Sequence, residues 1–217
     1  MSIIEQRASE PRWPAFVAAV GVGFLHYSLP EQLTYGPSWL LLVVTVVLLV
    51  PAVLFHRTGL YRLNEIFAYT SLGIITLALI SSLVLLVTRL PTHKDQPVEL
   101  LRAASALWIG NILVFASWYW RLDGGGPNER DKAGVHTDGA FLFPQMTMDH
   151  TQRVQMGEQC WSPGFIDYLF LAFNTSTAFS PTDVPVLSRW AKVLMIVQSM
   201  ISLATVALLA ARAVNIL

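Results

Sequence analysis

Hydrophobic residues along the chain gather into five long runs. Short polar segments separate the first four, and a longer insert precedes the last. The runs extend over Trp13 to Leu29, Ser38 to Phe55, Leu63 to Val87, Leu100 to Trp120 and Leu187 to Val214. About 20 apolar residues in a helix cross the ~30 Å hydrocarbon core of a bilayer. The pattern therefore predicts an all-α polytopic membrane protein with about five transmembrane helices. The first run has 17 residues and contains Gly21, Gly23 and His26, so a partly inserted or interfacial helix is the alternative there.

A sixth apolar segment, shorter than the others, precedes the last run. Ser162-Pro163-Gly164 suits a helix start, because a proline in the first turn lacks only an N–H that would have no partner within the helix. A helix from Gly164 to Ala178 would reach only about 22 Å. Ser180-Pro181-Thr182-Asp183 then breaks it. The segment is too short to cross, which predicts a re-entrant half-helix that returns to the side it entered.

These runs divide the chain into two parts. Residues 1–99 hold about three transmembrane helices. Residues 100–217 form a pore-like module with an outer helix at 100–120, a cap at 121–162, a half-helix and loop at 163–186, and an inner helix at 187–214. The cap has about 40 residues and few apolar side chains, so we expect a structured cap and not a second domain with its own core.

Composition supports a membrane protein and limits the chemistry. Hydrophobic residues make up 54% of the chain and charged residues 13%, with a formal net charge of zero, so there is no basic face for nucleic acid. Cys160 is the sole cysteine and can form no internal disulfide. We expect no metal and no cofactor, and no enzyme activity, because no nucleophile, base and orienting group can be assembled. The cap holds five residues of types that can bind a metal, but their spacing matches no metal motif, so we interpret them as part of a solvated loop: His136, Asp138, Asp149, His150 and Glu158.

The C-terminal stretch carries an ordered set of motifs. Asp167 starts the half-helix, Thr175-Ser176-Thr177 closes it, Ala178-Phe179-Ser180-Pro181-Thr182-Asp183 follows, and Trp190-Ala191-Lys192 opens the last helix. Without a gap, this order resembles the pore region of the tetrameric potassium-channel superfamily, in which Thr-Val-Gly-Tyr-Gly-Asp forms the filter. The resemblance implies a homo-oligomer, with a tetramer favoured, that passes monovalent cations passively.

The filter itself departs from that family. Ser180 and Thr182 stand where the family has glycines with positive φ, a conformation that a β-branched residue resists. Pro181 stands at the tyrosine position and has no N–H to brace the loop. We therefore expect weakly selective passage instead of potassium selectivity. The pore- or filter-like residues would be Thr175, Thr177, Ala178, Phe179, Ser180, Pro181, Thr182 and Asp183.

Several of these polar groups also have a purely structural interpretation. Hydroxyls in membrane helices often bond to their own backbone or to a neighbouring helix. Gln198 and Ser202 are candidates to face a cavity on the inner helix, but for Gln198 an interhelical hydrogen bond is the stronger alternative. The alternative function is a non-conducting membrane scaffold, sensor or small-solute-binding protein that keeps the channel-like frame for packing.

A second resemblance covers the C-terminal half. Its motifs are Trp118-Tyr119-Trp120, Gly125-Gly126-Pro127, Phe141-Leu142-Phe143-Pro144-Gln145 and the run from Ala210 to Leu217. They are similar to a family of uncharacterised bacterial integral membrane proteins, which implies a bacterial inner-membrane location, lipid as a partner, and no particular chemistry.

The basic residues give a separate indication of orientation. With the cap outside, as in potassium channels, five crossings would leave only four of the 14 Lys and Arg residues inside: Arg89, Lys94, Arg102 and Arg212. The positive-inside rule favours the reverse, with the amino end and the cap in the cytoplasm.

Overall fold

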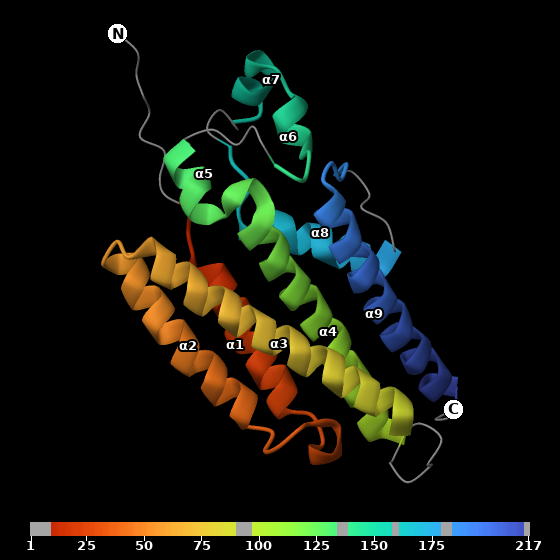
Figure 1. Cartoon of the computed structure of the whole chain (residues 1–217). Helices are drawn as coiled ribbons and strands as arrows, with labels where there is room; N and C mark the ends of the chain where they lie inside the picture. Colours follow the sequence, from red (N-terminus) through yellow and green to blue (C-terminus); the bar gives the residue numbers. More distant parts are fainter. Residues whose placement is uncertain (1–9, 90–96, 134–138, 158–160, 179–183, 215–217) are drawn as a thin grey trace.

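The computed structural model describes residues 10–89, 97–133, 139–157, 161–178 and 184–214, which form a bundle of long helices with short helices at one end (Figure 1). The long helices are α1 (Trp13–Tyr27), α2 (Leu40–Arg57), α3 (Tyr61–Arg89), α4 (Pro97–Leu122) and α9 (Arg189–Val214). The shorter elements are η1 (Glu31–Leu33), η3 (Asp123–Gly125), α5 (Pro127–Ala133), α6 (Pro144–Thr147), α7 (His150–Gln155) and α8 (Phe165–Ala178).

Four helices, α2, α3, α4 and α9, are long and apolar enough to cross a membrane. The prediction of an all-α, multi-pass membrane protein is confirmed at this level. Helix α2 continues through Pro51 to Arg57, two residues beyond the end of the hydrophobic run. Helix α1 has 15 residues and spans about 22 Å, so the expected count of five crossings is not confirmed.

Although it is short, α1 runs alongside the other helices of the bundle (Figure 1). It begins next to α5, where Arg12 bonds to Asp131, and near its other end His26 lies 3.5 Å from Ser82 of α3. The chain then continues through the buried residues Leu29 and Leu33. The amino end of α1 therefore lies at the cap end of the bundle.

Helix α4 is the central element. In the most apolar stretch of α4, 67% is buried inside the chain, against 22% in that of α2. The reason is that α1, α3, α8 and α9 all pack against α4. Small residues such as Ala103, Ala104 and Ala116 are buried on it, which allows close approach of neighbouring helices without relying on a hydrophobic driving force.

Main-chain geometry and main-chain hydrogen bonds join the cap to the bundle. After α4 the chain turns at Gly126, whose φ is +90° and where a Cβ would lie 2.7 Å from the Arg121 carbonyl oxygen. Further on, Leu142 donates to the Pro185 carbonyl (3.0 Å) and Leu187 to the Ala140 carbonyl (2.8 Å), around a β-bridge between Phe141 and Val186. The cap is thus tied to the segment that leads into α9.

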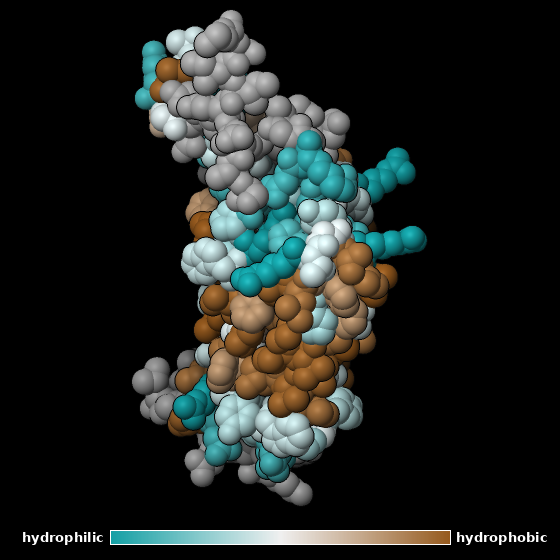
Figure 2. All heavy atoms as spheres, turned by 90° about the vertical axis from the view of Figure 1, so that its left-hand side faces the viewer, coloured by the Kyte–Doolittle hydropathy of each residue, from teal (hydrophilic) through white to brown (hydrophobic). Residues whose placement is uncertain are grey.

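The surface of the bundle divides into zones along its length. Figure 2 shows apolar residues covering the middle of one face, with hydrophilic residues gathered toward the cap end. Exposed apolar side chains on α2 include Val43, Val47, Val50 and Leu54. A continuous apolar zone of this kind is typical of a lipid-facing surface.

Candidate functional site

Helix α8 runs along α4 from the cap end toward the middle of the bundle. Near its start, the ring of Phe165 contacts Trp120, with 5.9 Å between centroids. Near its end, Phe173 contacts Trp108, with 6.3 Å between centroids. Trp120 and Trp108 are twelve residues apart, about 18 Å along α4. Measured along the axis of α4, the carboxyl end of α8 therefore lies farther from the cap than its amino end does.

Gln198 of α9 holds α8 in this position. Its side chain is fully buried, and its Nε2 donates to the Ala172 carbonyl oxygen (2.7 Å) and to the Ser176 hydroxyl (2.8 Å). Its Oε1 accepts a hydrogen bond of 2.5 Å from the Tyr119 hydroxyl of α4. The side-chain amide of Asn111 in α4 donates to the main-chain carbonyl oxygen of Gln198 at 3.2 Å. One glutamine thus links α4, α8 and α9.

Ser202 makes a second link one turn further along α9. Its hydroxyl donates to the Ser176 carbonyl oxygen at 2.7 Å and accepts from the Trp108 indole N–H at 3.0 Å. Ser202 is also fully buried. Gln198 and Ser202 were the residues of the inner helix expected to face a cavity. Both side chains instead form hydrogen bonds with other helices of the same chain.

The two threonines at the hydroxyl-rich end of α8 differ in exposure. Thr175 is fully buried and donates to the Leu171 carbonyl oxygen at 2.8 Å. Thr177 is exposed and donates to the Phe173 carbonyl oxygen at 3.0 Å, and Ala178 beside it is also exposed. The remaining filter-like residues, Phe179, Ser180, Pro181, Thr182 and Asp183, lie outside the described residues.

A polar cluster that the sequence did not reveal lies where the cap meets α4. Arg130 is buried; its Nη2 is 2.9 Å from the Glu10 carboxylate, and its Nη1 donates to the Trp120 and Asp123 carbonyl oxygens. The Asp123 carboxylate accepts hydrogen bonds from the Tyr168 hydroxyl (2.6 Å) and from a backbone N–H of the cap. The cluster joins the amino end, the cap and α8.

Arg12 extends this cluster toward α1. Its Nη2 lies 2.6 Å from the Asp131 carboxylate. Burial lowers the pKa of the Arg12 guanidinium from its ordinary value, and the carboxylates of Asp131 and Glu10 oppose this effect. Because an arginine titrates far above neutral pH, Arg12 remains a cation.

The cap shows no metal site in the part of the chain that the structure describes, where no group of three or more His, Cys, Asp or Glu residues is close enough to hold an ion. Asp149 serves instead as the N-cap of α7, accepting from the Gln152 N–H at 2.8 Å. His136, Asp138 and Glu158 lie outside the described residues.

No protein-family model, curated protein or solved structure matches the chain. The fold defines a multi-pass helical membrane protein, and a fully buried, hydrogen-bonded polar site outside the cap lies at the junction of α4, α8 and α9. Sequence reasoning singled out Gln198 and Ser202 of this junction. It missed Trp108 and Tyr119, since nothing in a single sequence shows which residues of α4 face α9.

Proposed function

We propose that the protein forms a homo-oligomeric pore, with a tetramer favoured, through which small cations pass passively. The observation that supports it is the hydrogen bond between Ser176 and Ser202, because Ser202 is thirteen residues, about 20 Å, beyond the start of α9. If α9 crosses the membrane, α8 ends at mid-depth and the chain must return to reach Arg189. That is the arrangement of a re-entrant half-helix between an outer helix, α4, and an inner helix, α9.

The carboxyl end of α8 has suitable chemistry for a cation. The last carbonyl groups of a helix carry a partial negative charge, which favours a cation near them. Thr177 and Ala178 are exposed at this end. In an oligomer the cations would pass Thr177, the carbonyl groups that follow, and a ring of Asp183 carboxylates. Without the family's filter glycines, passage would be weakly selective.

One outer face of α8 would be covered by lipid or by a neighbouring subunit. Ile166, Phe170 and Phe173 are 63%, 56% and 46% exposed, and their spacing of four and three residues places them on one side of the helix. In the proposed oligomer this stripe packs against the next copy. We further propose a bacterial inner-membrane location, on the resemblance to uncharacterised bacterial membrane proteins.

Planar bilayers containing the purified protein provide the test. We expect single-channel currents that Asp183→Asn reduces, because the variant removes the charged ring, and that Thr177→Ala alters. Thr88→Ala is the matched control, since Thr88 is also exposed and donates to the carbonyl four residues before it, but lies at the end of α3. Electrically silent bilayers that contain folded oligomer would contradict the proposal.

One observation favours the second candidate, a non-conducting scaffold, sensor or small-solute-binding protein. Gln198 and Ser202 are fully buried within a single chain, so neither side chain faces a surface that an oligomer could enclose. In this interpretation α8 serves packing alone. Native mass spectrometry separates the two candidates: a tetramer supports the pore, whereas a monomer at all protein concentrations supports the alternative.

A further inference from the structure

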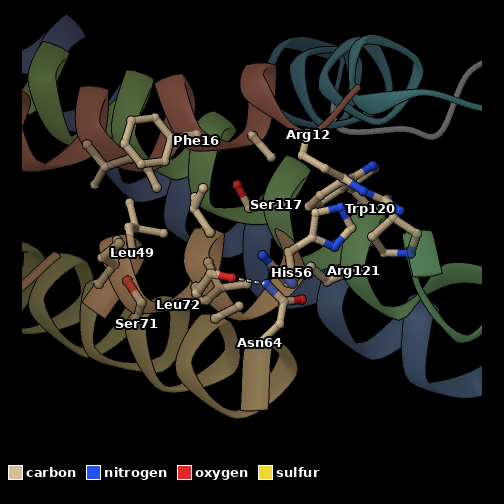
Figure 3. A pocket seen from close by; sticks show the side chains of 18 of the residues that line it. Arg12, Phe16, Leu49, His56, Asn64, Ser71, Leu72, Ser117, Trp120 and Arg121 are labelled. Carbon is tan, nitrogen blue, oxygen red and sulfur yellow. Dashed lines mark hydrogen bonds between the residues drawn. The ribbon is translucent and has the colours of Figure 1, made fainter. Parts of the chain in front are cut away.

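A cavity of about 110 Å³ lies between α1, α2, α3 and α4, next to the start of α5 and away from α8 and α9 (Figure 3). Its apolar walls come from all four helices and include Phe16, Ala19, Leu49, Leu72, Ile75 and Val114. It lies in a different part of the bundle from the proposed pore, so its function would be separate from ion passage.

Figure 1 shows α1 and α2 farther apart at the cap end, where the cavity lies, than at their other end. At the other end they are in tight contact: a Cβ on Gly23 would lie 2.8 Å from Leu42 Cδ1 and 3.2 Å from Leu42 Cα. Near the cap, Phe16 of α1 and Val53 of α2 both line the cavity and are 36% and 40% exposed. The space between the two helices therefore borders the lipid-facing side of the bundle.

The two ends of the cavity differ in chemistry. In Figure 3 the side chains of Arg12, His56 and Arg121 gather at one end, and those of Phe16 and Leu49 lie at the other. The polar end adjoins the cap, and the mostly apolar end, where Ser71 also lies, extends toward the middle of the bundle. An elongated site with a cationic end and an apolar end matches a molecule with an anionic head and a hydrocarbon chain.

The two arginines retain capacity to bind an anion. Arg12 uses Nη2 for Asp131, while its Nη1 is buried, 3.8 Å from a Glu10 carboxylate oxygen, and without a hydrogen-bond partner within the described ranges. The Arg121 guanidinium lies over the rings of Trp120 and Tyr69, at 5.1 and 6.0 Å from their centroids. Among the residues that the structure describes, no carboxylate lies within 4.0 Å of Arg121. Guanidinium groups bind carboxylates through paired hydrogen bonds, which such a site can supply.

We propose that this cavity binds a single-chain anionic amphiphile, a fatty-acid carboxylate, with its head against Arg12 and Arg121, which both line the cavity beside the Trp120 ring, and its first methylenes against Phe16, Leu49 and Leu72. A cavity of about 150 Å³ in another protein holds one benzene molecule, so this smaller space takes a few methylenes of one chain. The rest of the chain leaves between α1 and α2, past Phe16 and Val53, into the surrounding lipid. This site is additional to the proposed pore and does not depend on it.

Laurate binding to the purified full-length protein in a neutral detergent tests the proposal by calorimetric titration. We expect saturable binding of one laurate per chain and no binding of dodecyltrimethylammonium, which has a chain of the same length and a cationic head. Arg121→Gln should weaken laurate binding about tenfold or more, the scale of one charge-assisted hydrogen bond. Arg57→Gln is the matched control, because Arg57 is exposed at the end of α2 and does not line the cavity.

A second variant tests the apolar end. Ala68 lines the cavity and is 2% exposed, so Ala68→Leu should fill the space and abolish laurate binding. Equal affinity for the two amphiphiles, or unchanged laurate affinity in Arg121→Gln or in folded Ala68→Leu, would overturn the proposal. A bound phospholipid that is retained in native mass spectrometry and that laurate fails to displace would also overturn it.

Discussion

The hydroxyl of Ser202 donates a hydrogen bond of 2.7 Å to the main-chain carbonyl oxygen of Ser176. Ser176 is two residues from the end of α8, where helix carbonyl groups have no partner in their own helix. Ser202 is thirteen residues inside α9. The bond therefore fixes the end of a short helix against the middle of a long one, and the side chain of Gln198 reinforces it one turn away.

Replacement of Gln198 tests the strength of this junction. Gln198→Leu should lower the free energy of unfolding by about 2 kcal/mol, because the buried hydroxyls of Tyr119 and Ser176 lose a partner that leucine cannot replace. Unfolding of the purified protein in mixed micelles measures the change. Thr205→Ala is the control: Thr205 is equally buried but bonds within its own helix, so its loss should cost well under about 1 kcal/mol. Equal effects of the two variants would show that the junction contributes little.

Two glycines in helices give opposite expectations for the same substitution. Gly23→Ala should destabilise the protein by about 1–3 kcal/mol, because the new Cβ would meet Leu42 of α2 at 2.8 Å. Gly73→Ala should stabilise it by up to about 1 kcal/mol, because nothing lies within 4 Å and alanine loses less backbone entropy in a helix. Thermal unfolding of the two variants in detergent measures both effects. A stabilised Gly23→Ala would mean that α1 and α2 are not in close contact.

The buried ion pair between Arg130 and Glu10 is expected to matter far more than an exposed pair. The two side chains are 2% and 8% exposed, so Arg130→Met leaves a buried carboxylate whose remaining cationic neighbour among the described residues is Arg12 at 3.8 Å, and the variant should cost about 3–5 kcal/mol. Lys132→Met is the control, because the Lys132–Glu129 pair is more than half exposed and should contribute less than about 1 kcal/mol. Chemical unfolding measures both variants, and the double replacement Glu10→Gln with Arg130→Met should recover most of the loss.

The long helices could be predicted because their apolar runs match the thickness of a bilayer, which constrains sequence strongly. The short helix α8 was also predicted, from Gly164 to Ala178 where the structure has Phe165–Ala178, because Ser162-Pro163-Gly164 marks its start and Ser180-Pro181 marks its end. The sequence did not show which side chains of distant segments form hydrogen bonds with one another. The partners of Gln198 include a main-chain carbonyl of α8 and a tyrosine on α4, and nothing in the local pattern identifies either.

The cap cluster and the cavity show the same limit. Glu10 and Arg130 are 120 residues apart and read as ordinary surface charges in the sequence, yet both side chains are buried. Arg12, the residue before α1, and Arg121 of α4 likewise line one cavity. Such sites arise from the crossing of helices, so they emerge only when the bundle is assembled.

Site-directed thiol labelling tests the proposal that α8 enters the membrane partway and that the chain after it returns to the same side. In a Cys160→Ser background, single cysteines at Ser162, Ser188, Lys132 and Ser28 would be labelled in sealed vesicles of known orientation with a membrane-impermeant reagent. We expect Ser162 and Ser188, on either side of α8, to be labelled from the same face as Lys132 in the cap, and Ser28 beyond α1 to be labelled from the opposite face. Labelling of Ser162 and Ser188 from opposite faces would show that α8 crosses the membrane, and the re-entrant arrangement would be wrong.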